Sequence, residues 1–506
     1  MREIVLISLF SILLVGSAFA SIDSRYHTYE EVCAALDSLV EEFPGLCVKE
    51  SLGVSEVDKR IIWGLKITSN AEEEVDKPSV LFTGSIHAEE LIGTEIVLFA
   101  ARSLLEDYGE DPAVTRYLDS LKVWIIPIVN PDGHKVVTDG LDEYFRKNKH
   151  DNNGNGIFDF TPGDGGDTDG VDINRNFPYN WEFGNPNWDA TTYRGPRPGS
   201  ESETKAIISL CRRERFVTSV FYHSSAYGTY NEWVIYPWRW SGPVYSPDYE
   251  TIRDIAYEFA ERLVAHDGGS YNPRHSTSRT GNANDWQYSE IGTIPFIVEV
   301  DTCLRPEGWR VNSVCENQLA GIKYLLERSL GPGLWIHTYN DSSGEPVHAI
   351  IRVLEIYDDE LLSPRTTDST FGAHYRLLAP GDYTVVVSAR HFAVDTISVH
   401  IGDSPVKLDV GLRYVGIGEE QPFPQTASLE SFPNPFNSQV KIVYSLPRSE
   451  ATLKIFNLYG AKIYEQKLSF PSGECIFEPQ GSSSGVYICT VEGNSFFLSK
   501  KLLYIK

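Results

Sequence analysis

Residues 79–100 read SVLFTGSIHAEELIGTEIVLFA. The apolar run Val80–Phe82 is typical of a buried strand, and from Ile92 onward apolar residues recur at the spacing of one helix face. His87 and Glu90 lie three residues apart at the junction, just past the expected end of the strand. An imidazole nitrogen and a carboxylate in this position can converge on one cation. The stretch therefore predicts a strand-to-helix unit with candidate metal ligands at its junction.

The pattern of strands and helices continues on both sides of this stretch. Nearly continuous apolar runs, typical of strands buried on both faces, occupy residues 121–129, 218–222 and 295–300. Helix-like segments occupy residues 29–43, 249–266 and 317–330. The alternation predicts an α/β domain with a mixed, mostly buried sheet flanked by helices. After residue 331 the sequence pattern changes to that of short alternating strands and turns, which predicts two small all-β sandwich domains.

Two further residues strengthen the metal hypothesis. A catalytic zinc ion needs three protein ligands and one open position, and His223, at the end of an apolar run, is a candidate third ligand. Glu299 lies inside the run FIVEV, where a carboxylate is costly unless it is paired or functional. Apolar surroundings would raise its pKa and suit it to act as a general base. The alternatives are a surface histidine at His87 and a structural salt bridge at Glu299.

The order of several motifs resembles the M14 family of zinc carboxypeptidases over residues 25–330. These motifs are YHTY at 26–29, HAEE at 87–90, NPDG at 130–133, FRK at 145–147, NRNF at 174–177, YHS at 222–224 and the buried Glu299. Each motif is common alone, but the combination in this order is specific. The resemblance implies a secreted metallopeptidase that removes C-terminal residues from peptides or proteins.

The resemblance also implies a role for each site residue. Zinc is held by His87, Glu90 and His223, and Glu299 accepts a proton from the attacking water. Arg146 stabilises the oxyanion, while Asn174 and Arg175 hold the terminal carboxylate of the substrate. Asp172 accepts a hydrogen bond from a zinc-binding histidine, and Asn284 lies at the floor of the specificity pocket.

One position departs from the family pattern. Members usually carry a tyrosine that covers the bound substrate, and Thr277 stands at about that position here. Arg279 is the nearest candidate replacement. Because of this departure, a catalytically inactive surface-binding protein remains an alternative function. A further alternative is an M14-like hydrolase of cell-wall peptides.

An insertion after Arg146 resembles a calcium loop. Oxygen-bearing side chains stand at Asp151, Asn153, Asn155 and Asp159, with Gly156 at the expected sharp turn. The usual glutamate at the twelfth position is missing, because Pro162 stands there. A solvated turn cluster explains the same composition, so Ca²⁺ is one of two hypotheses for this segment.

The two ends of the chain resemble targeting segments. An apolar run followed by Ala18-Phe19-Ala20 predicts a cleaved signal peptide and a mature protein without a membrane span. The last 75 or so residues, with FPNPFN at 432–437, resemble the C-terminal sorting domain of type IX secretion, which implies export through the periplasm and outer membrane of a bacterium by that machinery.

The middle sandwich, with YRLLAPGDY at 375–383, resembles the transthyretin-like, or carboxypeptidase-regulatory-like, domain. The expected parts are a signal peptide at 1–20, a catalytic domain at 21–331, a β-sandwich at 332–415, a linker at 416–427 and a sorting domain at 428–506.

The composition of the chain limits the classes of partner that it is expected to bind. The chain has 506 residues and a net charge of -26, and an acidic surface repels phosphate backbones, so no nucleic-acid partner is expected. The seven cysteines form no C-x-x-C pair, which argues against a cysteine zinc site. Export permits disulfides, and proximity in sequence makes Cys33/Cys47, Cys303/Cys315 and Cys475/Cys489 plausible pairs, beside the alternative of buried free thiols.

Overall fold

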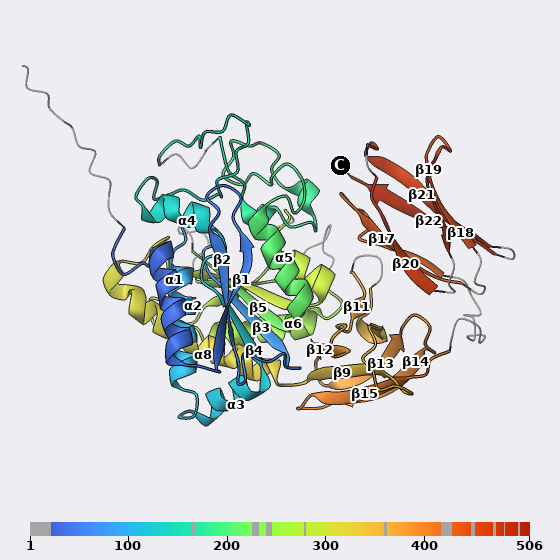
Figure 1. The fold of residues 1–506 in the computed structure, drawn as a ribbon, viewed down its shortest axis with the longest axis horizontal. Helices are drawn as coiled ribbons and strands as arrows, with labels where there is room; N and C mark the ends of the chain where they lie inside the picture. The colour runs from blue at the N-terminus through green and yellow to red at the C-terminus, as the bar shows by residue number, and fades with distance from the viewer. Residues whose placement is uncertain are drawn as a thin grey trace, which may run out of the picture.

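Figure 1 shows an α/β body, coloured blue to yellow, with two β bodies in orange and red beside it. The computed structural model describes residues 22–163, 168–224, 232–238, 245–277, 280–358, 362–415, 428–446, 451–468, 472–479, 481–493 and 496–505. The expected signal peptide and the expected linker at 416–427 lie outside these residues.

The α/β body is built on one mixed sheet of eight strands in the order β1-β2-β4-β3-β5-β8-β6-β7. The strands are β1 (Cys47–Val54), β2 (Ile61–Ile67), β3 (Ser79–Thr83), β4 (Lys122–Ile126), β5 (Thr218–Ser224), β6 (Trp233–Tyr236), β7 (Asn272–His275) and β8 (Ile294–Val300). The central strands β4, β3, β5 and β8 run parallel, whereas β1, β2 and β6 introduce antiparallel pairs. Every residue of β3 and β5 is buried, as their apolar runs predicted.

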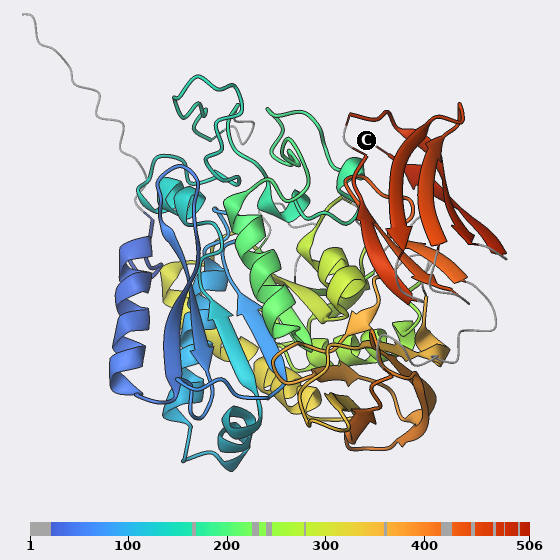
Figure 2. The same ribbon diagram turned by 45° about the vertical axis from the view of Figure 1, so that its right-hand side comes forward.

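Helices cover both faces of this sheet. They are α1 (Tyr29–Glu42), α2 (Ile92–Glu106), α3 (Pro112–Ser120), α4 (Pro131–Thr138), α5 (Ser202–Glu214), α6 (Tyr249–Glu261), α7 (Ala283–Trp286) and α8 (Val311–Ser329). Figures 1 and 2 show α1, α2 and α8 on one side of the sheet and α5 on the other. The sequence predicted α8 only from residue 317. It begins earlier because Val311, Val314 and Cys315 extend the buried helix face.

The helix starts carry local signals that the sequence displays. Thr28 caps α1 by accepting a hydrogen bond from the backbone of Glu31, whose side chain bonds back to Thr28. Asn130 caps α4 by accepting a hydrogen bond from the backbone of Gly133, with Pro131 in the first turn. The motifs YHTY and NPDG are therefore helix entrances, which explains part of their place in the chain.

The middle β-domain consists of two small sheets in the orders β11-β10-β13-β14 and β12-β9-β15. Its strands are β9 (Gly333–Asn340), β10 (Ile350–Val353), β11 (Arg365–Thr366), β12 (Ala373–Leu377), β13 (Gly381–Ser388), β14 (Asp395–Ile401) and β15 (Val406–Leu412). Pairing is antiparallel except between β9 and β15. Apolar residues of both sheets form one core, as a sandwich requires.

The C-terminal β-domain also has two sheets, β16-β17-β20 and β19-β18-β21-β22. Its strands are β16 (Ser428–Phe432), β17 (Val440–Ser445), β18 (Ala451–Asn457), β19 (Lys462–Leu468), β20 (Ser472–Phe477), β21 (Gly485–Gly493) and β22 (Phe496–Tyr504). All pairs within them are antiparallel. The predicted α/β body followed by two all-β domains is therefore confirmed.

The cysteine pairs suggested by proximity are wrong. All seven thiols are free, and five of them are buried. Cys33 is half-buried on α1, for example, whereas the Cys47 thiol donates to the carbonyl of Leu39. The buried thiols act as small apolar groups. Among the described residues, no helix is both long enough and apolar enough to cross a membrane.

Candidate active site

The candidate site lies at one edge of the central sheet, where β3, β5 and β8 end. These three strands run parallel, with β5 between β3 and β8. His87 follows the end of β3, and His223 of β5 stands opposite Glu299 of β8 in the strand register. Because parallel strands end at the same edge, the fold brings together residues that are far apart in the chain.

The turn after β3 depends on a glycine. A Cβ atom at Gly84 would lie 2.5 Å from backbone atoms of Gly93 and Thr94 in α2. Backbone atoms of a buried helix cannot move aside, so a larger residue would force β3 and α2 apart. This close approach folds the intervening residues into the tight loop that presents His87 and Glu90.

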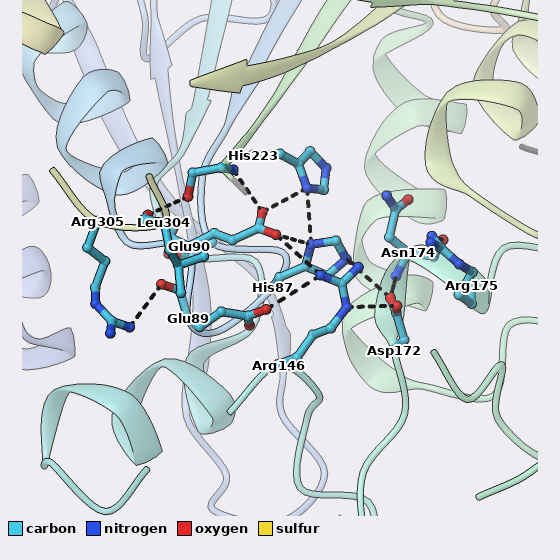
Figure 3. A network of polar contacts seen from close by, with 12 residues as sticks. His87, Glu89, Glu90, Arg146, Asp172, Asn174, Arg175, His223, Leu304 and Arg305 are labelled. Carbon is cyan, nitrogen blue, oxygen red and sulfur yellow. Dashed lines mark hydrogen bonds and ion pairs between the residues drawn. The ribbon is translucent and has the colours of Figure 1, made fainter. Parts of the chain in front are cut away.

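Three side chains of metal-ligand type converge at this edge (Figure 3). The two carboxylate oxygens of Glu90 lie 2.9 Å from His87 Nδ1 and 2.9 Å from His223 Nδ1, respectively. The two Nδ1 atoms are 3.0 Å apart, and all three side chains are buried. Two imidazoles and one carboxylate around a common point form the ligand set of catalytic zinc sites, so these residues fit a zinc ion.

Asp172 contacts the other ring nitrogen of His87. Its Oδ1 lies 3.2 Å from His87 Nε2, and its Oδ2 accepts a hydrogen bond of 3.1 Å from Arg146 Nε. Burial raises the pKa of Asp172, but the charges of Arg146, Arg175 and His87 hold it well below the ordinary value. An ionised carboxylate on Nε2 leaves Nδ1 of His87 free to bind a cation.

Glu299 is half-buried beside this cluster. Burial first, and then the negative charge of Glu90, raise the pKa of Glu299 to about 8. A raised pKa increases the proton affinity of the ionised carboxylate, which makes it a stronger proton acceptor. A structural salt bridge, the alternative for Glu299, is absent among the ion pairs of the described residues.

The residues expected to hold substrate lie on the adjacent segment. The 3-10 turn η1 (Ile173–Arg175) follows Asp172, and the guanidinium of Arg175 is half-buried. Asn174 Oδ1 accepts a hydrogen bond of 2.9 Å from the backbone of Ala283, the residue before Asn284. Asn284 is buried, and both polar atoms of its side chain lack a hydrogen-bond partner. A buried amide without partners is unusual, which points to a group that completes its bonding from outside the chain.

Arg146 occupies the centre of the charged network. Its Nη1 lies 3.3 Å from Glu90 Oε1 and 3.5 Å from Glu89 Oε1 (Figure 3). Glu89 is a contact that sequence reasoning missed, although it stands beside a predicted ligand. Its side chain is buried, a state in which a carboxylate needs a cation nearby. The pair of consecutive glutamates, 89 and 90, was the available signal.

The position of the missing tyrosine is a surface position. Thr277 is exposed just after β7, and Arg279 lies outside the described residues.

The calcium prediction is not supported. Both carboxylate oxygens of Asp151 accept hydrogen bonds from backbone amides of the loop, at 2.7 Å from Gly154 and 2.8 Å from Gly156. Asp159 Oδ2 accepts from the amide groups of Asn153 and Asn155, at 2.8 and 2.6 Å. The loop thus satisfies its own acceptors, as an Asn/Asp turn cluster does.

Comparison with known proteins agrees with this geometry. The zinc carboxypeptidase family matches residues 32–319, and the secretion system C-terminal sorting domain matches residues 430–506. Carboxypeptidase A2 of Rattus norvegicus is 30% identical over 272 residues, which cover 52% of this chain and 59% of that protein. For carboxypeptidase A2 of Mus musculus the identity is 30% over 319 residues, covering 60% and 70%. An inactive metallocarboxypeptidase of Saccharomyces cerevisiae is 26% identical over 326 residues, covering 61% and 72%.

A solved structure supports the fold. The crystal structure of thrombin activatable fibrinolysis inhibitor superposes with a TM-score of 0.51 at 23% identity, covering 60% of this chain and 74% of that one. The family match spans more than half of the chain and contains the whole convergent cluster. The chain therefore belongs to the zinc carboxypeptidase family of metallopeptidases and ends in a secretion-system sorting domain.

Proposed function

We propose that the protein is a secreted zinc metallocarboxypeptidase that removes C-terminal residues from peptides or proteins. The observation that carries the proposal is the convergence of His87, Glu90 and His223 at the sheet edge, with Glu299 opposite His223 in the register. The fold alone would be compatible with an inactive relative. The complete set of ligands and a half-buried carboxylate beside it favours hydrolysis.

Each group has a definite task in this proposal. When bound by His87, Glu90 and His223, zinc would lower the pKa of a water molecule and polarise the scissile carbonyl. Glu299 would accept the proton of the attacking water and deliver it to the leaving amine. Arg146 would donate hydrogen bonds to the oxyanion of the tetrahedral intermediate. Asp172 keeps His87 in the tautomer that leaves Nδ1 free.

The proposal of exopeptidase action rests on Arg175, a fixed cation beyond the proposed cleavage site. The guanidinium of Arg175 is a planar fork that matches a carboxylate, and Asn174 adds an amide next to it. A substrate whose terminal carboxylate is bound there presents only its last peptide bond to Glu299. The partly exposed state of Arg175 leaves it accessible to such a substrate.

The preferred terminal residue would be polar. Asn284 is buried and has a donor and an acceptor without partners. An apolar substrate side chain would leave both groups unsatisfied, which costs about 1–3 kcal/mol. A terminal residue that can both donate and accept hydrogen bonds would remove this penalty.

A test of exopeptidase action compares one peptide with a free and an amidated C-terminus. We expect amidation, or the Arg175→Ala variant, to lower kcat/KM by about 100-fold, since each removes one charge-assisted contact. Arg116→Ala removes an exposed arginine elsewhere and should have little effect. Equal cleavage of both peptides would refute exopeptidase action and favour an endopeptidase or a hydrolase of cell-wall peptides. No cleavage of any peptide would favour the inactive binding protein, for which the missing tyrosine at 277 argues.

The sorting domain indicates export by type IX secretion. We further propose that a signal peptide at 1–20 first directs the chain to the periplasm, and that the mature protein reaches the medium or the cell surface. A chain that ends at residue 427 should then accumulate inside the cells, whereas the full chain should leave them. Equal secretion of both chains would contradict this route.

A further inference from the structure

A second cluster of ligand-type side chains lies outside the proposed active site. It consists of Glu56, in the turn after β1, His150, in the segment that follows Arg146, and Glu201, at the N-cap position of α5. His150 Nδ1 lies 3.1 Å from Glu201 Oε2 and 3.7 Å from Glu56 Oε2. All three ligand atoms lie within 4.8 Å of one another, as in the first cluster. We propose that this cluster is a second binding site for a divalent transition metal such as Zn²⁺, which goes beyond the proposed peptidase activity.

The charges of the cluster favour a cation. Glu201 is fully buried, and two residues further on Glu203 is buried as well. The amide of Asn148 donates to both carboxylates, at 2.8 Å to Glu201 and 3.3 Å to Glu203. The Ser200 hydroxyl also donates to Glu201, at 2.5 Å. Burying an ionised carboxylate is costly unless hydrogen bonds or positive charge compensate it, and a bound divalent ion would add positive charge here.

The Nδ1 atom of His150 lies near two carboxylates. It is inaccessible to solvent, and neither carboxylate oxygen is aligned with it for a hydrogen bond. A buried ring nitrogen that has carboxylates nearby but no well-aligned hydrogen bond calls for an explanation. A metal ion between this nitrogen and the two oxygens would satisfy all three groups at once.

The surroundings leave room for the ion and for water. A cavity of about 570 Å³ opens beside the cluster and is lined by Glu56 and His150, together with Lys59, Ser200 and Lys205. Three cations, Lys59, Arg197 and Lys205, also line this cavity, but Lys59 Nζ donates to the Glu56 carbonyl and Lys205 Nζ to the Ser200 carbonyl, each at 2.5 Å, and neither lysine forms an ion pair with the cluster's carboxylates among the described residues. The open side would accept the remaining water ligands of the metal.

The donor set indicates the class of metal. One imidazole and two carboxylates suit Zn²⁺ and its first-row neighbours, whereas Ca²⁺ and Mg²⁺ prefer oxygen ligands alone. The site would tie together the turn after β1, the start of α5 and the segment that carries Arg146. We therefore assign it a stabilising task.

Metal content of the purified full chain tests the site. After removal of metal by a chelator and dialysis against Zn²⁺, we expect two zinc ions per wild-type chain by mass spectrometry. His150→Ala should bind one, and His223→Ala should bind one. The double variant should bind none, and excess Ca²⁺ should displace neither ion. Zn²⁺ should also raise the Tm of His223→Ala, in which only the second site remains.

Further variants keep the test decisive if His150→Ala does not fold. Glu56 is exposed, so Glu56→Gln should fold normally and weaken the second zinc by about 10-fold, whereas Glu41→Gln on the exposed face of α1 should not. A single zinc per wild-type chain that is lost in His223→Ala but kept in His150→Ala would overturn the proposal, as would a second zinc that survives both His150→Ala and Glu56→Gln. A single zinc per wild-type chain that is lost in His150→Ala but kept in His223→Ala would support this site and refute the proposed catalytic centre.

Discussion

The two β-domains contact the catalytic domain in different ways. Leu362 and Leu377 of the middle domain are part of the same apolar cluster as the core of the catalytic domain, and Tyr375 packs against that cluster. The core of the C-terminal domain is a separate cluster, built from its own two sheets. The middle domain therefore has a core of its own and also contributes residues to the core of the catalytic domain, whereas the core of the terminal domain contains only its own residues.

Polar contacts deepen this contrast. Arg365 of the middle domain is buried and donates to the carbonyls of Tyr288 and Ser289, at 2.7 and 2.9 Å. Arg376, also buried, pairs with Asp248 at 3.0 Å. Contacts of the C-terminal domain include a hydrogen bond of 3.2 Å from Asn437 to the Pro178 carbonyl, which is a neutral pair near the surface. Buried charges are costly to separate, but a neutral surface pair is not.

The position of these arginines links the middle domain to the active site. Tyr288 and Ser289 belong to the π-helical turn η3 (Gln287–Ile291), which continues α7 directly. α7 carries Asn284, the expected floor of the specificity pocket. Arg365 therefore fixes the end of the helical segment that positions the pocket. Through this contact the middle domain stabilises the expected specificity pocket.

Truncation should give the largest effect. A chain that ends at residue 331 would expose Asp248 and the carbonyls of η3 and remove part of the shared core, so we expect it to be insoluble or unfolded. A chain that ends at residue 427 should retain its zinc and its peptidase activity within about 2-fold. Soluble yield and circular dichroism of both chains check the prediction. Full activity of the shorter chain would remove the distinction between the two domains.

Single substitutions at the two interfaces should differ in size. Arg365→Ala removes two charge-assisted hydrogen bonds to buried carbonyls, which then keep only the backbone amides of Gly292 and Ser363 as donors, and should lower the free energy of unfolding by about 2–4 kcal/mol. It should also raise KM more than it lowers kcat, because η3 and α7 move together. Asn437→Ala should change stability by less than about 0.5 kcal/mol. Denaturant titration and peptide kinetics measure both, and similar losses for the two variants would contradict the contrast.

A smaller, pH-dependent effect is expected at the rim of the middle domain. His337 Nε2 lies 2.5 Å from Asp76 Oδ2, and Tyr375 donates to the other oxygen of Asp76. The hydrogen bond to Asp76 raises the pKa of His337. Burial raises the pKa of Asp76, but hydrogen bonds from His337 and Tyr375 outweigh it and lower this pKa.

The sign of this effect follows from the two shifts. The contribution of His337 is fully present below the ordinary histidine pKa and is lost as the pH rises through the raised value. The contribution of Asp76 is present above the ordinary aspartate pKa and is lost as the pH falls through the lowered value. The pair is partly exposed, so it should be worth less than about 1 kcal/mol. His337→Gln should lower the Tm by no more than about 2 °C at pH 6 and change it less at pH 9. A larger loss at pH 9 would contradict this assignment.

Sequence reasoning reached the candidate site through its strands. His87, His223 and Glu299 stand at or near the ends of apolar runs, and parallel strands bring such ends together by rule. Glu89 and Arg365 were missed because their significance depends on partners remote in sequence. No local pattern shows that Arg365 meets carbonyls 76 and 77 residues away. The cysteine pairs and the calcium loop failed because spacing alone does not report burial or competing hydrogen bonds.

The central claim is that one buried set of ligands and one carboxylate perform peptide hydrolysis. Zinc content and release of the C-terminal residue should therefore be measured on the same preparations of wild type, His223→Ala and Glu299→Gln. We expect His223→Ala to lose the catalytic zinc and all activity. Glu299→Gln should keep its zinc and lose at least about 1,000-fold in kcat, because only the proton acceptor is removed. Wild-type activity in Glu299→Gln, or undiminished hydrolysis after loss of the zinc bound by His223, would contradict the account.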